Sequence, residues 1–319
     1  MSNTLPITLR IGTRGSDLAL YQADVTEAAL GVAFPEMKLE RRIIKTTGDR
    51  RTDVALSEVA KEDGVFDKGV FIKEIEQALE DGTVDLAVHS LKDMPTELED
   101  GFALAAVLPR GPVRDVLISR DGSDLMELPE GARVGTSSPR RAKQAEYLHP
   151  DLKIVDLRGN VPTRLEKLAR GEDYDAILLA EAGLVRLGYL LEQPCHEGSE
   201  ALVGIEGLRA VRLPENEFYP AAGQGAIGLE IRWGDKQTRS LAKTICHDAT
   251  WTCITAEREF LRLLDAGCHT PVGVYSTLKQ GLITMKARVF PEAGGQPKTS
   301  EAKGDDPYAV AQELFDSLP

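Results

Sequence analysis

The order of apolar and amphipathic segments is the feature that most constrains the fold of this chain. In the first third, strand-like segments at 7–11, 39–45 and 84–89 alternate with a helix from Ser16 to about residue 30 and a helix over 71–79. Strands buried on both faces form apolar runs, and intervening helices serve as crossovers between parallel strands. The pattern therefore predicts an α/β fold with a largely parallel sheet.

A second stretch of the chain repeats this order of elements. Strands are predicted at 134–136, 154–157 and 174–179, and helices start at Ser138-Pro139 and at 163, the latter ending at Gly171. The spacing between matching elements differs, so the repeat is one of architecture and not of sequence. We predict two similar lobes, like those of periplasmic binding proteins, around a cleft at the carboxyl ends of their strands.

The pattern changes beyond about residue 247. A helix over 255–264, strands at 272–276 and 283–289, and a closing helix over 309–318 predict a smaller α+β domain. Segments that contain Pro and Gly, at 108–112 and 213–225, are typical of connections between lobes. We expect a first lobe of 1–110 with 222–243, a second lobe of 111–221, and a C-terminal domain of 244–319.

Arginines gather where predicted strands turn into helices. Residues 133–170 contain nine Lys and Arg against four Asp and Glu, a balance of +5 in a chain whose net charge is −13. Helix amino termini favour negative charge, and a guanidinium can hold a carboxylate or phosphate through two parallel hydrogen bonds. The segments Ser137–Arg141 and 157–164 therefore indicate a binding site for a polyanion.

Several classes of function are disfavoured. The acidic total and the lack of aromatics within the basic segment argue against a nucleic-acid partner. The turn 11–16 lacks the Gly-Lys-Ser/Thr ending of a phosphate-binding loop. No run approaches the length of a membrane span, and the first residues do not form a signal sequence, so we expect no membrane association and a cytoplasmic location.

The four cysteines are Cys195, Cys246, Cys253 and Cys268. Three of them precede a histidine, which raises the possibility of a zinc site. Adjacent residues of a strand point to opposite faces, however, and the usual ligand spacings are absent, so we predict no metal. Reduced thiols are the expectation for a protein of this compartment.

Polar residues follow the third predicted strand directly, in the segment 89–95. Asp93 fits a role in proton management or in stabilising a transient cation, and a simple turn residue before proline is the alternative. Lys92 and Arg14 are candidate anion ligands or solvated charges, and Ser16 is a helix cap. Cys268, in a Gly- and Pro-framed loop, fits either a covalent attachment point or a small buried thiol.

Six segments together resemble the porphobilinogen deaminase (hydroxymethylbilane synthase) family. They occur in that family's order between about residues 7 and 290, and jointly they are far more specific than any one alone. The segments are 11–20, 87–95, 135–141, 157–165, 220–226 and 267–273.

The resemblance implies an enzyme that joins four porphobilinogen molecules into hydroxymethylbilane with release of ammonia, on a dipyrromethane cofactor bound through a thioether to Cys268. It implies that Asp93 is catalytic and that the substrate is porphobilinogen. A monomer in the cytoplasm, or in an organelle stroma after loss of a transit peptide, is the expected form. Cofactor ligands would be Ser90, Lys92, Ser137, Ser138, Arg140, Arg141 and Arg158, and substrate ligands Arg14, Ser16, Arg164 and Gln224.

A different class of function also accounts for part of the pattern. A two-lobed binding protein that closes on a small carboxylate explains the lobes and the arginines, but it leaves the C-terminal domain and Cys268 without a purpose. Two segments, 48–68 and 188–206, depart from the family pattern by being longer. We favour the enzyme, because it uses all three predicted parts of the chain.

Overall fold

The computed structural model describes residues 8–50, 71–192, 198–265, 271–291 and 294–318. Contacts between Cα atoms divide the chain into two compact units. Unit 1 is Met1–Arg110 with Ala226–Thr252, and unit 2 is Gly111–Gly225 with Cys253–Pro319. No helix within the described ranges is both long and apolar enough to cross a membrane.

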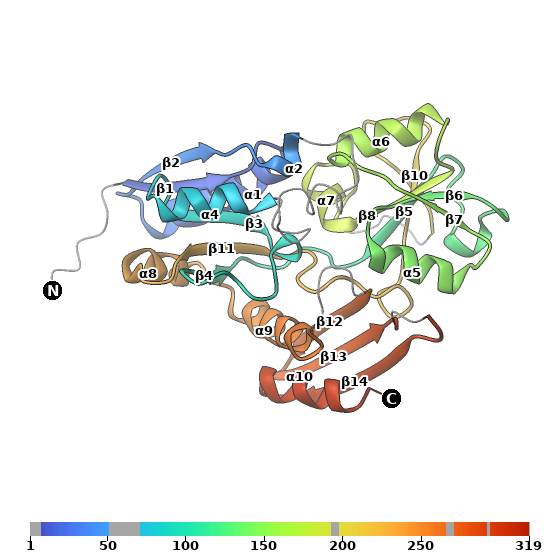
Figure 1. The fold of residues 1–319 in the computed structure, drawn as a ribbon. Helices are drawn as coiled ribbons and strands as arrows, with labels where there is room; N and C mark the ends of the chain where they lie inside the picture. Colours follow the sequence, from blue (N-terminus) through green and yellow to red (C-terminus); the bar gives the residue numbers. More distant parts are fainter. Residues whose placement is uncertain (1–7, 51–70, 193–197, 266–270, 292–293, 319) are drawn as a thin grey trace. The chain divides into compact units, whose positions relative to one another are not determined.

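Unit 1 is built on a five-stranded mixed sheet (Figure 1). Its strands, in spatial order, are β2 (Lys38–Ile43), β1 (Thr8–Thr13), β3 (Leu86–Ser90), β11 (Ile227–Arg232) and β4 (Phe102–Val107). β1 pairs in parallel with both β2 and β3, whereas β11 is antiparallel to β3 and to β4. The helices of this unit are α1 (Asp17–Ala33), α2 (Thr47–Arg50), α4 (Lys73–Glu80), the short 3-10 helix η2 (Leu91–Asp93) and α8 (Lys236–Thr244).

The second lobe, in unit 2, has a six-stranded sheet. The strands, in spatial order, are β7 (Lys153–Val155), β6 (Arg133–Gly135), β8 (Ala176–Ala180), β5 (Asp115–Ser119), β10 (Arg209–Arg212) and β9 (Glu200–Ala201). The helices are η3 (Leu125–Glu127), α5 (Pro139–Leu148), α6 (Val161–Arg170) and α7 (Glu181–Arg186). β6 is parallel to β7 and β8, and β5 is antiparallel to β8.

The two lobes therefore share one winding. In each lobe, a helix connects the first strand to a second strand beside it, and a further helix connects that second strand to a third strand on the opposite side of the first. The resulting order is β2-β1-β3 in unit 1 and β7-β6-β8 in unit 2. An antiparallel strand from elsewhere in the chain then joins each sheet, β11 in one and β5 in the other. This confirms the predicted architecture of two similar α/β lobes.

Three local signals act at helix ends as predicted, whereas α6 begins at Val161 instead of 163 and the helix predicted over 255–264 begins at Asp248. The Ser16 side chain accepts from the backbone N of Ala19 and begins α1. The Ser138 side chain accepts from the backbone N of Arg141 at the start of α5, with proline in the first turn. Gly171 ends α6 with a φ of 77°, in the left-handed region that favours glycine.

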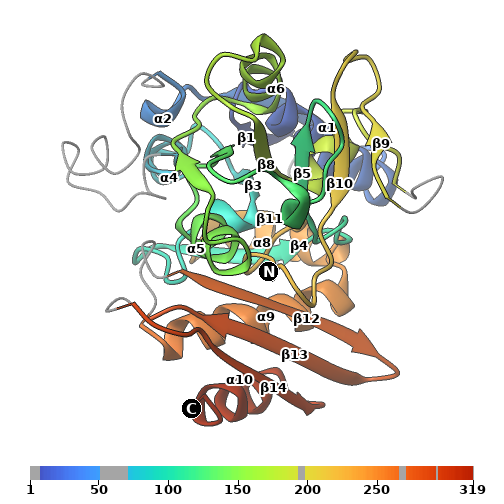
Figure 2. The same cartoon turned by 90° about the vertical axis from the view of Figure 1, so that its right-hand side faces the viewer.

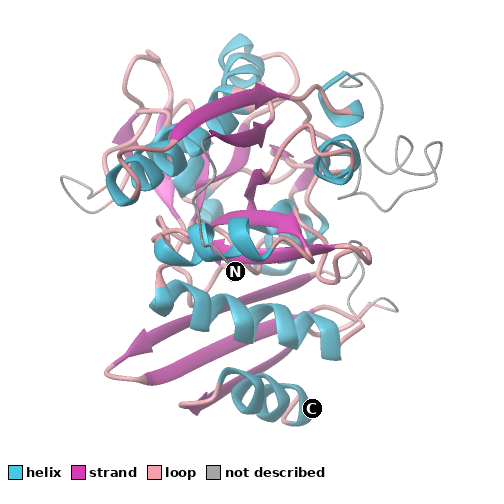
Figure 3. Cartoon of the chain, turned by 90° about the vertical axis from the view of Figure 1, so that its left-hand side faces the viewer, coloured by secondary structure: helices cyan, strands magenta, loops and turns pink. Residues whose placement is uncertain are grey.

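The C-terminal part of unit 2 is a three-stranded antiparallel sheet with two helices, which confirms the predicted α+β character (Figures 2 and 3). The strands are β12 (Val272–Lys279), β13 (Leu282–Val289) and β14 (Lys298–Gly304), and the helices are α9 (Asp248–Leu263) and α10 (Pro307–Asp316). Side chains of both helices and all three strands form one apolar core. The strand β14 was not predicted, because its sequence has only one buried apolar residue, Ala302.

The predicted connections fall at the boundaries of the two units. The chain passes from unit 1 to unit 2 between Arg110 and Gly111 and returns between Gly225 and Ala226. The first point lies inside the Pro- and Gly-containing segment 108–112, and the second lies at the end of the segment 213–225. A third crossing, between Thr252 and Cys253, was not predicted. The finer division into three domains, with limits at 221 and 244, stays a prediction.

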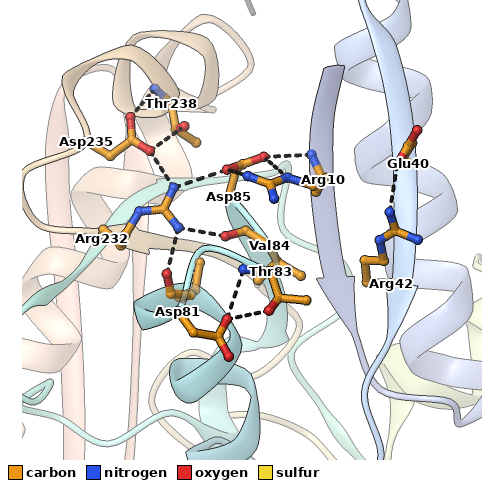
Figure 4. A network of polar contacts seen from close by, with 11 residues as sticks. Arg10, Glu40, Arg42, Asp81, Thr83, Val84, Asp85, Arg232, Asp235 and Thr238 are labelled. Carbon is orange, nitrogen blue, oxygen red and sulfur yellow. Dashed lines mark hydrogen bonds and ion pairs between the residues drawn. The ribbon is translucent and has the colours of Figure 1, made fainter. Parts of the chain in front are cut away.

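An ion-pair network ties together the segments at one end of the unit 1 sheet (Figure 4). Asp85, just before β3, accepts from Nε and Nη2 of Arg10 on β1 at 2.9 and 2.7 Å and from Nη2 of Arg232 on β11 at 3.1 Å. Arg232 also donates to Asp235, which caps α8. Although burial opposes it, the two arginines hold the pKa of Asp85 below its usual range.

A second group of ionisable side chains lies within the core of unit 1. His89 Nε2 lies 2.9 Å from Oε2 of Glu230, whose side chain is fully buried. Glu76, on α4, is also buried, and Oε1 of each glutamate has no hydrogen-bond partner among the described residues. Burial, with the negative charges of Glu230 and Glu99, raises the pKa of Glu76 from 4.5 to about 7.

This raised pKa predicts a pH-dependent stability. Between pH 4.5 and about 7 the native state holds a proton on Glu76 that the unfolded chain releases, so this group's contribution is full below that window and lost as the pH rises through it. We expect Glu76→Gln to gain up to about 3 kcal/mol over the parent protein on going from acid to neutral pH. Urea unfolding across this range measures the effect.

Glu80→Gln is the matched control, because Glu80 lies on the same helix and is exposed. It should leave the pH dependence of unfolding unchanged. Parallel pH profiles for Glu76→Gln and the parent protein would contradict the assignment.

Candidate active site

Asp93 closes the 3-10 helix η2, immediately after β3. Buried Leu91 and Met94 flank it, and the backbone N of Leu91 donates to the carbonyl of Ala226 at 3.1 Å. Ser90, at the end of β3, accepts a hydrogen bond from Gln22 of α1 at 2.7 Å. Asp93 is partly exposed, on a segment that is held through the backbone of Leu91 and through the side chain of Ser90.

Arg14 and Ser16 follow β1, the parallel neighbour of β3. Parallel neighbours end at the same edge of a sheet, so the turn with Arg14 and the turn with Lys92 and Asp93 share one edge of unit 1. Arg14 forms an ion pair with Asp49. The Ser16 side chain is used as the cap of α1.

In unit 2 a serine links the two arginine-bearing turns. Oγ of Ser137, after β6, donates to the carbonyl of Leu157 at 2.7 Å and accepts from its backbone N at 3.2 Å. Arg158 follows at once and is buried. Nε of Arg164, on α6, donates to the carbonyl of Gly159 at 2.7 Å. The predicted ligands on the two turns are thereby brought to one edge of the second sheet.

Arg140 and Arg141 are buried and share one internal carboxylate. Oδ2 of Asp115, which begins β5, accepts from Nη1 of Arg140 at 2.7 Å, and Oδ1 accepts from Nε of Arg141 at 2.8 Å. Asp115 is fully buried. Burial lowers the pKa of the Arg140 guanidinium, and Asp115 opposes that shift. These three side chains together carry a charge of +1, which suits an anion.

Gln224 joins the same cluster from the returning connection. Its Nε2 donates to the carbonyl of Val113 at 2.6 Å and to Oδ1 of Asp115 at 3.2 Å, while Oε1 accepts from Arg140 at 3.5 Å. Arg140 Nη1 also donates to the carbonyl of Tyr219 at 2.6 Å. Gln224 is fully buried, so in this structure it orders the arginines and the chain around them.

Cys268 lies outside the described residues, but the elements that flank it are described. The carboxylate of Glu257, on α9, accepts from the backbone N of Gly223 at 2.8 Å and from the backbone N of Ser276 on β12 at 2.8 Å. Gly273, near the start of β12, lies so close to Tyr219 that a Cβ there would be 2.4 Å from the tyrosine Cβ. The strand β12, which follows Cys268 in the sequence, is thus attached to the segment 213–225, here called the Gln224 connection.

The remaining described cysteines have packing roles. Cys253 is buried, and burial raises the pKa of the Cys246 thiol, which makes it less reactive. Cys195 lies outside the described residues. No group of three or more potential metal ligands occurs in the ranges that the structure describes.

Sequence reasoning missed two acidic residues of this site. Asp115 was not selected, although an acidic residue that opens an apolar strand of the second lobe is an available signal. Asp49 was not selected either, because its partner Arg14 lies 35 residues away in the sequence. Both carboxylates hold arginines that the sequence did identify.

Two α/β lobes with arginines at their strand ends and a smaller α+β part define a multidomain α/β protein. A family model described as "Porphobilinogen deaminase, dipyromethane cofactor binding domain" matches residues 9–240, and the C-terminal domain of that family matches 251–318. The chain belongs to the porphobilinogen deaminase family, which confirms the resemblance seen in its sequence.

Individual relatives agree with this assignment over nearly the whole chain. The porphobilinogen deaminase of Moorella thermoacetica is 42% identical over 98% of this chain and 93% of its own length. That of Brevibacillus brevis is 43% identical over 97% and 93%, respectively. Among solved structures, the periplasmic VFT2 domain of Bordetella pertussis BvgS superposes with a TM-score of 0.44 at 13% identity, covering 75% of this chain and 86% of that domain.

The shared carboxylate makes Asp115→Asn a sharp test of the arginine cluster. The amide leaves two buried guanidinium groups without their counter-charge, so we expect a loss of about 3–5 kcal/mol in the free energy of unfolding. Denaturant unfolding measures this loss.

Glu146→Gln is the control, because Glu146 pairs with Lys143 on the exposed face of the same helix α5. An exposed pair of this kind contributes less than about 1 kcal/mol. Equal stabilities for the two variants would show that Asp115 does not hold the cluster.

Proposed function

We propose that this chain polymerises porphobilinogen into the linear tetrapyrrole hydroxymethylbilane, releasing one ammonia for each unit joined. The match to both family domains, over residues 9–240 and 251–318, is the observation that supports this function most strongly. Dipyrromethane, the cofactor of the family, supplies the primer on which the chain of pyrroles is extended. The reaction places the protein in tetrapyrrole biosynthesis.

The chemistry of the substrate explains why arginines are needed. Each pyrrole unit has an acetate and a propionate side chain, so the growing product accumulates two carboxylates per unit. Guanidinium groups at strand ends hold such carboxylates with directed hydrogen bonds. The arginines of unit 2 fit this demand. Arg140 and Arg141 follow β6, and Arg158 follows its parallel neighbour β7. The cluster of Arg140, Arg141 and Asp115 also keeps a net positive charge.

We assign Asp93 the catalytic role. Loss of the aminomethyl nitrogen as ammonia and attack by the next pyrrole both build positive charge on pyrrole nitrogens, which a fixed carboxylate stabilises. Lys92 and Ser90 lie one and three residues before Asp93 and are assigned to the cofactor. Arg14 and Ser16 share the sheet edge of Asp93 and are assigned to the substrate.

The second lobe is assigned mainly to the cofactor. Ser137, Ser138, Arg140, Arg141 and Arg158 are proposed to hold its carboxylates. Arg164 is assigned to the substrate, and Gln224, which is buried, is proposed to serve substrate binding by ordering Arg140. The donor set fits an oligocarboxylate, because guanidinium, hydroxyl and amide groups all donate. The thioether is assigned to Cys268, in the segment that precedes β12.

We further propose that the protein is a cytoplasmic monomer without a nucleic-acid partner. An acidic protein of charge −13 has no general affinity for nucleic acid, and the family assignment implies a single small-molecule substrate.

Intact mass spectrometry tests the attachment site. The purified chain should be heavier than its sequence by a two-pyrrole adduct and should give a colour with Ehrlich's reagent. Cys268→Ser should lose both signals, because serine cannot form the thioether.

Cys246→Ser is the matched control and should retain the adduct, since Cys246 packs against the core of unit 1. An adduct that persists in Cys268→Ser would assign the attachment to another residue.

Asp93→Asn tests the catalytic assignment. The amide preserves shape and loses charge, so the variant should keep its cofactor while turnover falls by at least roughly 100-fold. Ammonia release and the mass of the holoprotein measure the two properties separately. Ordinary turnover would remove Asp93 from the mechanism.

A further inference from the structure

Arg14 is held on two sides by residues that have no assigned role. Its Nε lies 3.1 and 3.2 Å from the two carboxylate oxygens of Asp49, and its Nη2 also donates to Asp49. The ring of Phe71 lies under the guanidinium, with Cζ 4.2 Å from the ring centroid. One edge and one face of the guanidinium are therefore occupied within unit 1.

Asp49 is itself anchored independently of Arg14. Its Oδ2 accepts from Oγ1 of buried Thr46 at 2.7 Å. Although burial opposes it, Arg14 and Thr46 hold the pKa of the Asp49 carboxyl below its usual range, so it is ionised at neutral pH. The Asp49 carboxylate is therefore held in place by Thr46 and in turn fixes the position of the Arg14 guanidinium.

Phe71 is also fixed in place. Oγ1 and the backbone N of Thr47 both donate to Oε1 of Glu74 at 2.7 Å, which ties α2 to α4. The Phe71 ring packs on Gly48 so closely that a Cβ there would lie 2.2 Å from it. The ring is therefore packed against α2 on one side, and Phe71 lies two residues before the start of α4.

The planar guanidinium has five N–H donors, and Asp49 takes those of the edge formed by Nε and Nη2. Among the described residues, Nη1 makes no hydrogen bond. The Arg14 side chain is 24% exposed, and we infer that the edge formed by Nη1 and the second hydrogen of Nη2 is the one that meets a ligand. A carboxylate fits that edge with two parallel hydrogen bonds.

We propose that Asp49 and Phe71 are positioning residues that aim the free edge of Arg14 at a carboxylate of the substrate. Arginine has several rotatable bonds, and a side chain that is ordered before binding loses less entropy when the ligand arrives. Because Asp49 cancels the charge of Arg14, the pair attracts a ligand through directed hydrogen bonds more than through net charge. This inference rests on the proposed role of Arg14 in substrate binding.

A second arginine–aspartate pair of unit 1, Arg10 and Asp85, serves as a comparison because it does not face the edge that carries Asp93. Arg10, four residues before Arg14, forms a similar bidentate contact with Asp85, and Arg232 and Asp235 complete a closed network around that pair. Asp85 precedes the start of β3, whereas Asp93 follows the end of that strand. Asp85→Asn therefore provides a control for the loss of one arginine–aspartate contact in this lobe.

Steady-state kinetics of the holoenzyme with porphobilinogen test the proposal. Asp49→Asn should raise KM roughly 3- to 10-fold and leave kcat within about twofold, because only binding depends on the aim of Arg14. Phe71→Leu, which keeps apolar bulk, should shift KM in the same direction. Asp85→Asn should leave KM unchanged.

The double variant separates positioning from other effects. Arg14→Leu alone should raise KM at least as much, and Asp49→Asn should add nothing further in that background. An unchanged or lower KM in Asp49→Asn and in Phe71→Leu would overturn the proposal, a lower KM being the sign that Asp49 competes with the substrate. An unchanged KM in Arg14→Leu would instead remove Arg14 from the proposed function.

Discussion

Carboxylates hold three of the candidate-site arginines, Arg14, Arg140 and Arg141, and the candidate site depends on that pairing. Asp115 lies between Arg140 and Arg141 in the interior of the second lobe, and Asp49 holds Arg14 in the first. A buried guanidinium is costly without a counter-charge, and an exposed one samples many rotamers. One carboxylate between two guanidinium groups supplies the counter-charge that burial requires. It also leaves a net positive charge and orders both arginine side chains.

The winding of the sheets determines where these groups lie. In each lobe a central strand has parallel neighbours on both sides, so the turns that leave them meet at one edge. Asp93 and Arg14 share that edge in unit 1, and Ser137, Arg140 and Arg158 share it in unit 2. The Gln224 connection then reaches the arginine cluster and, through Gly223 and Glu257, the strand that follows the Cys268 segment.

Much of this could be predicted where the signal is local. Ser16, Ser138 and Gly171 act as the caps that their residue types and neighbours indicate, and the family motifs identified the arginines and Asp93. The strands β4, β5, β10 and β11 were not predicted, and the pairings that place them in their sheets join residues distant in sequence, such as Leu229 and Val88. Asp115 and Asp49 were missed because a lone aspartate does not indicate which arginine it will meet.

The sequence by itself determined the helix caps at Ser16, Ser138 and Gly171, the alternation that makes two α/β lobes, and the kinds of side chain available for an anionic substrate, because each of these follows from neighbours a few residues apart. Only the tertiary structure decided which carboxylate orders which guanidinium, and that His89 and Glu230 meet within the core. Those pairings span up to 141 residues, and they arise when strands from separate parts of the chain enter one sheet.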